Sequence, residues 1–192
     1  MNLARESIEL LGQIARIFLF EGARHGLSDR EWMALRFLAY ANRFSRTPSA
    51  LAGYVGTTRG TASYIVNELE RNGYLERTRS AKDKRSVTLS VTQQGKKFLA
   101  RDPINALVDA IAVLDGDGKT GFRDALRQVL DHSDAARQKS HAGICSRCIF
   151  LREGRANDES RTPAKFTCRL FRAAIAEAEI ELLCTSFEHR KH

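Results

Sequence analysis

The chain has 192 residues, a length that suggests one domain, or one domain with a compact appendage. Hydrophobic residues make up 43% of it and charged residues 28%, which excludes a collagenous, low-complexity or wholly disordered chain. Thirty-one Lys and Arg residues against twenty-three Asp and Glu residues give a formal net charge of +8. This excess favours an anionic partner, meaning nucleic acid or an anionic membrane surface.

The apolar runs of the sequence are short. None approaches the roughly 18 residues of a membrane span, and the N-terminus lacks the apolar core of a signal peptide. These features predict a cytoplasmic protein without a membrane partner. Thiols stay reduced in the cytoplasm, so the four cysteines are expected to be metal ligands or redox groups rather than disulfides.

Helical periodicity dominates the first part of the chain. Residues 3–20 carry apolar residues over a face so wide that this helix needs more than one packing partner. Ser28 with Glu31 three residues later has the pattern of a capping box and predicts the start of a second helix. That helix turns Trp32 and Leu35 inward. With only three prolines in the chain, these patterns favour a helix-rich fold.

Two further helices follow, separated by a tight turn. Thr47-Pro48 begins a short helix, and Gly56 breaks it. Residues 59–71 predict the next helix, which Gly73 ends in the left-handed conformation. The side chains expected to face the core from this helix are Ala62, Ile65, Val66 and Leu69.

The periodicity then changes from helical to alternating. Residues 74–78 and 87–91 predict two strands, and the charged residues 79–86 between them predict a hairpin with a basic tip. Between Gly53 and Arg101 the chain carries ten basic and four acidic residues, a net charge of +6. The attraction to an anionic partner is therefore centred on this part of the chain.

More helix is expected after the hairpin. Thr92 begins one helix, and Pro103 kinks or restarts it. Residues 115–118 predict a loop, and residues 122–138 predict a last amphipathic helix.

The short helix, the tight turn and the helix over 59–71 have the pattern of a helix-turn-helix, and the hairpin adds a wing. The second helix begins with small hydroxyl residues and an arginine, which suit base edges and phosphates in the major groove. The basic hairpin tip suits the adjacent minor groove. Tyr64 is either a base contact or a half-buried flank. The candidate DNA-binding residues are Thr57, Thr58, Arg59, Thr61, Ser63, Tyr64, Lys82, Lys84 and Arg85.

These segments resemble the MarR family of bacterial transcription regulators over about residues 5–138. Val91-Thr92 stands where the family has Leu-Thr, a mild departure. The motifs that carry the resemblance are Ser28-Asp29-Arg30-Glu31-Trp32, Glu70-Arg71-Asn72-Gly73-Tyr74-Leu75-Glu76-Arg77, Asp83-Lys84-Arg85 and Leu89-Ser90-Val91-Thr92-Gln93-Gln94-Gly95.

The resemblance implies an obligate homodimer, made by the N-terminal helix and the last two helices of each subunit. It also implies binding to a pseudo-palindromic operator in double-stranded DNA, and a small-molecule effector held between the dimer helices and the DNA-binding lobes. Trp32, Phe37, Tyr40 and Phe44 are candidates to line such a pocket, although as core residues they need no ligand.

All four cysteines lie in the last quarter of the chain. The expected organisation is a winged helix-turn-helix with dimerisation helices over 1–139, followed by a cysteine-rich metal-binding segment over 140–192. One CxxC pair with two further cysteines nearby indicates a four-thiolate site. The alternative is that the last two cysteines are small core residues. The candidate metal ligands are Cys145, Cys148, Cys168 and Cys184, and His141 and His189 are either substitute ligands or surface histidines.

The cysteine spacing does not decide the metal. A single CxxC without an internal glycine, among bulky apolar neighbours, favours a [4Fe-4S] cluster, with Zn²⁺ as the alternative. Residues 169–183 have the pattern of a helix. If this helix were straight, it would hold Cys168 and Cys184 about 24 Å apart. A shared site therefore requires a break, which is expected around residues 176–179, or a site split between subunits.

The sequence contains no glycine-rich phosphate loop, HExxH or G-x-S-x-G motif, so an enzyme is not expected. The predicted function is a sequence-specific transcription regulator, a repressor, whose iron–sulfur centre senses redox or iron state. One alternative is a ligand-responsive regulator with a structural zinc site. Another is an iron–sulfur electron-transfer or thiol-redox protein.

Overall fold

The computed structural model describes residues 2–20, 26–79, 87–137, 141–154 and 164–190. The described part is mostly helical with small antiparallel sheets, which confirms the predicted fold class of a winged helix-turn-helix. None of the described helices is long and apolar enough to cross a membrane. The helices are α1 (Leu3–Phe20), α2 (Asp29–Tyr40), α3 (Pro48–Val55), α4 (Arg59–Arg71), α5 (Gln93–Leu99), α6 (Asn105–Ala112) and α7 (Gly116–Arg137). The strands are β1 (Leu75–Arg79), β2 (Val87–Val91), β3 (Gly143–Ile144), β4 (Leu151–Glu153), β5 (Phe166–Cys168), β6 (Ala173–Ile175) and β7 (Leu183–Cys184), with short 3-10 helices η2 (Cys145–Arg147) and η3 (Glu177–Glu179).

Local capping explains where α2, α3 and α4 begin. Ser28 and Glu31 close the predicted capping box at the start of α2. Thr47 caps α3, and Thr58 caps α4 by accepting a hydrogen bond from the third residue of the helix. Gly56 ends α3 at φ +68°, a conformation that glycine adopts without the steric cost of a side chain. The helix bounds predicted for α4 are confirmed.

The core of the winged-helix unit lies between α2, α3, α4 and the hairpin of β1 and β2. The four side chains that were predicted to face inward from α4 are all buried. In the hairpin, Leu75 pairs with Val91 and Arg79 with Val87, and this register turns Leu89 inward. The largest fully buried side chains of this core are Trp32, Phe37, Leu35, Leu38, Leu51, Leu69, Leu89 and Val66.

A buried ion pair joins the winged-helix unit to the helices that follow it. The Arg36 guanidinium on α2 donates to both carboxylate oxygens of Asp102, each at 2.5 Å. Asp102 lies in the turn between α5 and α6 and also accepts from the backbone N–H of Ile104 at 3.0 Å. Both side chains are almost fully buried. The pair therefore fixes the turn between α5 and α6, where the chain leaves the winged-helix unit.

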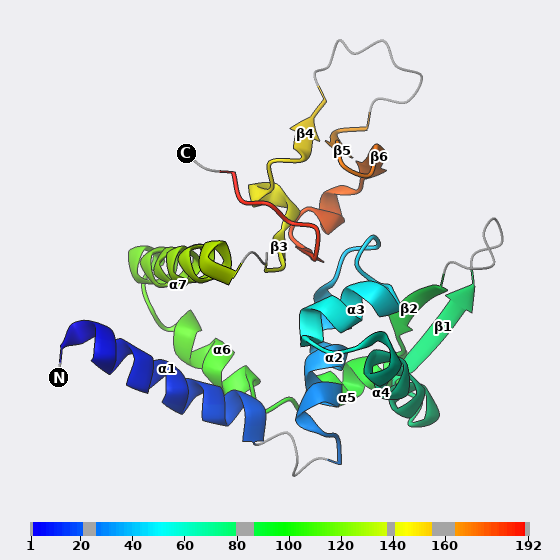
Figure 1. Cartoon of the computed structure of the whole chain (residues 1–192), viewed down its shortest axis with the longest axis horizontal. Helices are drawn as coiled ribbons and strands as arrows, with labels where there is room; N and C mark the ends of the chain where they lie inside the picture. Colours follow the sequence, from blue (N-terminus) through cyan, green and yellow to red (C-terminus); the bar gives the residue numbers. More distant parts are fainter. Residues whose placement is uncertain (1, 21–25, 80–86, 138–140, 155–163, 191–192) are drawn as a thin grey trace.

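Helices α1, α6 and α7 lie together on one side of the molecule, away from the hairpin (Figure 1). They leave large apolar side chains open to solvent, among them Leu10 and Ile14 on α1 and Val129 on α7. A groove between α1 and α7 is lined by these residues together with Phe122 and Leu126. The wide apolar face that the sequence predicts for α1 is thus uncovered in the single chain.

The predicted loop over residues 115–118 is wrong, because α7 already begins at Gly116. The Asp115 carboxylate accepts a hydrogen bond from the backbone N–H of Gly118 at 2.6 Å. This contact satisfies an amide at the start of the helix, so the polar, glycine-rich stretch becomes the first helical turn.

The helix predicted over residues 169–183 is also wrong. Instead, β6 pairs antiparallel with β5, Phe166 opposite Ile175 and Cys168 opposite Ala173. The chain reverses through a tight turn in which Arg172 has a φ of +48°. Burial of Phe166 and Ile175 in a small core overrides the helix propensity of the alanine- and glutamate-rich stretch. Because there is no helix over 169–183, the break expected around 176–179 does not arise: η3 follows β6, and the chain returns through β7.

Candidate functional site

The N-terminal half of α4 presents a polar, exposed face. Arg59, Ser63 and Tyr64 are exposed, and the side chain of Tyr64 is 63% accessible. The alternative that Tyr64 is a half-buried flank is therefore wrong. Because Ala62 and Ile65 are buried on the opposite side, α4 is held by its apolar face with its polar face outward.

The predicted hydroxyl residues of this site have different surroundings. Thr58 is exposed, but it serves as the cap of α4: its Oγ1 accepts from the backbone N–H of Thr61 at 3.2 Å. The two threonine hydroxyls also share a hydrogen bond of 3.0 Å. Thr57 and Thr61 are half-buried. Thr58 thus positions the helix start, and the outer surface belongs to Arg59, Ser63 and Tyr64.

The wing is attached to α4 by an arginine that the sequence prediction omitted. Arg77 on β1 forms an ion pair with Glu70 of α4 at 3.2 Å and a hydrogen bond with Asn67. Both partners lie on α4, so this contact fixes the hairpin relative to the helix. The predicted wing contacts Lys82, Lys84 and Arg85 lie outside the described residues.

The candidate effector-pocket residues do not share one cavity. Trp32 and Phe37 are core residues, each 1% exposed. Phe44 stacks on Phe171 with ring centroids 4.3 Å apart. Tyr40 is exposed and lines a cavity of about 680 Å³, to which Arg46, Glu76 of β1 and Lys96 of α5 contribute charged side chains.

A helix-turn-helix with an exposed polar second helix, followed by an antiparallel hairpin, defines a winged-helix DNA-binding protein. Residues 141–154 and 164–190, called the cysteine lobe from here on, are packed against this unit.

The cysteine lobe brings all four predicted ligands together. Cys145, Cys148, Cys168 and Cys184 are each 9% exposed or less and belong to one buried cluster with Phe166, Ile175 and Phe187. All four line a single small cavity. Cys168 and Cys184 lie on β5 and β7, so the separation that a straight helix would impose does not arise. The apolar helix on which these two cysteines would be core residues is absent, but both are buried in an apolar cluster, so the alternative that they are small core residues stays open.

Two of the sulfurs interact directly. A hydrogen bond from the Cys145 thiol lowers the pKa of Cys184 to about 6, and contacts from Ser186, Asn42 and Ser45 act in the same direction. The same hydrogen bond, with burial, raises the pKa of Cys145. The hydrogen bond therefore favours the thiolate form of Cys184, which is the form that binds metals and attacks disulfides.

The cysteine lobe contacts the loop between α2 and α3, residues 41–47, called the α2–α3 loop here. The Asn42 side-chain N–H donates to Cys145 Sγ at 3.3 Å, and the Asn42 backbone N–H donates to the Leu183 carbonyl at 2.8 Å. Arg43 pairs with Glu179 at 3.9 Å. Sequence reasoning missed these residues, because nothing local in the sequence marks a loop residue that contacts a cysteine about a hundred positions away.

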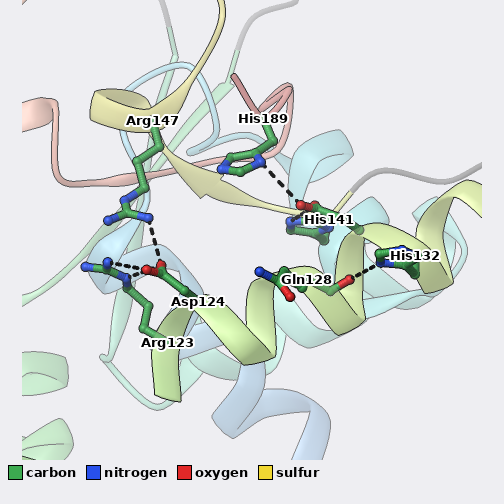
Figure 2. A network of polar contacts seen from close by, with 8 residues as sticks. Arg123, Asp124, Gln128, His132, His141, Arg147 and His189 are labelled. Carbon is green, nitrogen blue, oxygen red and sulfur yellow. Dashed lines mark hydrogen bonds and ion pairs between the residues drawn. The ribbon is translucent and has the colours of Figure 1, made fainter. Parts of the chain in front are cut away.

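The lobe also contacts α7 through a polar network (Figure 2). Arg147, between the two cysteines of the CxxC pair, donates to Asp124 at 3.1 Å. His141 and His189 both face Asp131 of α7, at 3.5 and 3.3 Å. The two histidines therefore contribute to the contact with α7, and neither is an isolated surface residue. The cysteine lobe bridges the winged-helix unit and α7.

The donor set of the cavity suits a thiolate-bound metal centre: four buried cysteines, with an amide N–H directed at one sulfur. Among the residues that the structure describes, no three His, Cys, Asp or Glu side chains are grouped so that they could hold a metal ion as they stand.

Comparisons with known proteins agree with the winged-helix assignment. Residues 25–86 match the MarR family. The chain is 31% identical over 112 residues to the HTH-type transcriptional regulator YkoM of Bacillus subtilis (strain 168), covering 56% of this chain and 69% of that protein. It is 31% identical over 117 residues to the transcriptional repressor MprA of Escherichia coli (strain K12), covering 59% of this chain and 66% of that protein.

The fold is similar to that of Sco3205, a MarR family transcriptional regulator from Streptomyces coelicolor solved in complex with DNA. The TM-score is 0.53 at 24% identity, over 70% of this chain and 88% of that one. The chain belongs to the MarR family, and it is a MarR-type DNA-binding transcriptional regulator.

Proposed function

We propose that the protein is a dimeric repressor that places α4 in the major groove of a pseudo-palindromic operator. The observation that carries this proposal is the polar N-terminal half of α4, exposed opposite a fully buried apolar face. Sco3205, of similar fold, is described in complex with DNA, and the relative MprA is named a repressor. A dimer would bind two half-sites about 10 bp apart, one helical turn of DNA.

The uncovered apolar surface of α1 and α7 supports a homodimer. Leu10 and Val129 are each more than half exposed in the single chain. Apolar side chains gathered in one groove usually mark an interface. A second copy of the chain would cover them and would hold the two α4 helices at a constant separation.

Replacing Arg59 by Ala is expected to weaken operator binding and to lower the salt dependence of the affinity by about one phosphate equivalent. The reason is that Arg59 is exposed at the first position of α4, and a helix N-terminus itself favours phosphate. The measurement is a gel-shift titration against the protein's own promoter region at several salt concentrations.

The matched control is a substitution of Arg71, because it removes the same charge at the other end of α4, about 18 Å along the helix axis. Arg71→Ala should leave the affinity nearly unchanged. Equal losses for both variants would contradict the proposed orientation of α4. If the unmodified protein prefers its promoter no more than random DNA, the repressor proposal fails.

We further propose that the four cysteines hold a metal centre, a [4Fe-4S] cluster, that senses redox or iron state. Their burial in one cavity supports this, as do the aromatic residues Phe44, Phe150 and Phe171, which line that cavity. When bound, a cluster would supply a redox-active group whose loss changes the charge and packing of the lobe. Zn²⁺ is the alternative, and would give a structural site without a redox response.

Replacing any one of the four cysteines by Ser is expected to remove most of the bound metal after anaerobic loading with ferrous iron and sulfide. The hydroxyl of serine is a poor substitute for a soft thiolate ligand. The measurements are metal and sulfide content and visible absorption: a brown protein contains iron and sulfide, whereas a colourless protein with bound zinc has the structural site.

Operator affinity, measured with and without air, then tests the sensor. Metal loss in the variants with unchanged affinity in every redox state would leave a structural centre and no sensor. Full metal content in all four variants would contradict the site itself. Disulfide formation without bound metal would favour a thiol-redox protein. In that alternative, the hydrogen-bonded Cys145 and Cys184 are the pair expected to form the disulfide.

A small-molecule effector is a second candidate signal. The observation that favours it is the cavity beside α2, β2 and α5, which is lined by Tyr40, Arg46, Glu76 and Lys96. Its charged lining suits a polar ligand rather than an apolar one. A ligand bound there would contact both the wing and the helix that leads to α6.

A further inference from the structure

The cysteine sulfurs are contacted by a residue of the DNA-binding unit. Asn42, in the α2–α3 loop, is 1% exposed, and its side-chain N–H donates to Cys145 Sγ at 3.3 Å. A buried amide N–H without a hydrogen-bond partner costs free energy. The orientation of the Asn42 side chain therefore depends on how strong a hydrogen-bond acceptor the Cys145 sulfur is. The contact therefore joins the chemistry of the cysteine cavity to a position that precedes the helix-turn-helix.

The same loop is held tightly against the cysteine lobe. The backbone N–H of Ser45 donates to the Asn42 side-chain oxygen Oδ1 at 3.1 Å and to the Asn42 backbone carbonyl at 3.0 Å, which closes the loop on itself. Ser45 Oγ accepts from the backbone N–H of Thr185 at 3.0 Å, directly after Cys184. Ser45 is 1% exposed. A change in the orientation of Asn42 would consequently move a closed, buried turn rather than a free side chain.

The far end of the loop reaches the two elements that meet DNA. The backbone carbonyl of Arg46 accepts from the N–H of Leu89 on strand β2 of the wing at 2.8 Å. Thr47 Oγ1 accepts from the N–H of Ala50 at 3.2 Å and begins α3, the first helix of the helix-turn-helix. A short path made of residues 42–47 and of hydrogen bonds at its two ends thus runs from the cysteine cavity to both the wing and α3.

We propose that Asn42 is the positioning residue through which the state of the cysteine centre controls the wing and α3. The proposal rests on the proposed function of Cys145 as a metal ligand. A metal-bound sulfur is a stronger acceptor than an unligated thiol or a disulfide sulfur, since charged acceptors form stronger hydrogen bonds. When the acceptor weakens, Asn42 turns to another partner, and residues 41–47 rearrange with it. Operator affinity then follows the state of the centre.

The test compares operator affinity between metal-loaded and metal-free protein in full-length Asn42→Ala and in the unmodified chain. Loading uses ferrous iron and sulfide under anaerobic conditions. In the unmodified chain the two affinities should differ by about 5- to 150-fold, the usual range of coupling between sites. In Asn42→Ala this ratio should fall close to one, while metal content and metal-free affinity stay within about twofold of the unmodified values.

Arg43→Ala is the matched control. Arg43 joins the same loop to the lobe through Glu179 and the Ala174 carbonyl. Its removal loosens the loop without taking a donor from a sulfur, so the affinity ratio should stay that of the unmodified chain. If Asn42→Ala does not fold, Asn42→Leu replaces it, because it keeps the side-chain volume and removes the N–H donor without adding a charge, while the Ser45 N–H keeps its bond to the Asn42 backbone carbonyl at 3.0 Å.

Two further measurements distinguish coupling between the cysteine centre and the wing from a general loosening of the α2–α3 loop. Loss of the N–H donor should shift the reduction potential of the loaded centre to a more negative value, because hydrogen bonds to sulfur stabilise the more negative, reduced state. Hydrogen exchange of the Leu89 amide should respond to metal loading in the unmodified chain and not in Asn42→Ala.

The possible outcomes distinguish failure of the Asn42 coupling from failure of the metal-dependent sensor on which it rests. If the unmodified chain loads metal and responds to it, but Asn42→Ala responds equally, the inference is overturned and the sensor stands. If the unmodified chain loads metal without any change in affinity, the sensor fails and the inference fails with it. If it loads no metal, the metal centre itself is refuted, together with both proposals.

Discussion

Replacing Asp102 by Ala is expected to lower the free energy of unfolding by about 3–5 kcal/mol, because it leaves the buried Arg36 guanidinium without its carboxylate. The loss includes two hydrogen bonds of 2.5 Å and the bond from the Ile104 amide that begins the turn into α6. The measurement is urea unfolding at constant protein concentration, since the stability of the proposed dimer would depend on concentration.

Two comparisons make this result specific to the ion pair. Asp109→Ala removes an exposed carboxylate from the neighbouring helix α6 and should change stability by less than about 0.5 kcal/mol. The double variant Arg36→Met with Asp102→Leu should cost much less than the two single changes together, because a buried pair replaced by apolar residues leaves no unpaired charge. Additive losses would show that the two side chains act independently.

The ion pair matters to function because of its position. Asp102 lies where the chain leaves the winged helix for α6 and α7. In a dimer joined through α1 and α7, the angle at this turn would set the distance between the two α4 helices. The cysteine lobe makes a second connection between the same two parts, through Asn42 on one side and Asp124 on the other. Two independent connections restrict how the DNA-binding unit can tilt.

Local signals made the helix-turn-helix predictable from the sequence. The bounds of α4, its end before Gly73 and its buried side chains all follow from residues within a few positions of one another, whereas the capping role of Thr58 was not predicted. Helix capping and helical periodicity are short-range effects, so the sequence contains the information they need. The strands of the wing were predictable for the same reason, with β1 shifted by one residue.

The cysteine lobe was less predictable because its structure depends on long-range pairing. The stretch after Cys168 is rich in alanine and glutamate, which favour a helix locally, yet it forms β6 against β5. Likewise, the CxxC spacing draws attention to Cys145 and Cys148, whereas the structure gives Cys145 a hydrogen bond with the distant Cys184. The contact from Asn42 has no local signature at all. These features appear only once burial brings the segments together.

Leu69→Ala is expected to cost about 2–5 kcal/mol of unfolding free energy and to abolish operator binding at temperatures where the unmodified chain still binds. Leu69 is fully buried, and truncation removes its transfer free energy and leaves a cavity between α4 and α2.

Tyr64→Ala is the counterpart on the same helix, because Tyr64 is 63% exposed and its loss should leave stability within about 0.5 kcal/mol. If Tyr64 contacts DNA, its variant should lose affinity while its unfolding midpoint in urea stays constant. Leu69→Ala should lower both affinity and midpoint. A Tyr64 variant that destabilises the fold as much as Leu69→Ala would contradict the outward orientation of that face of α4.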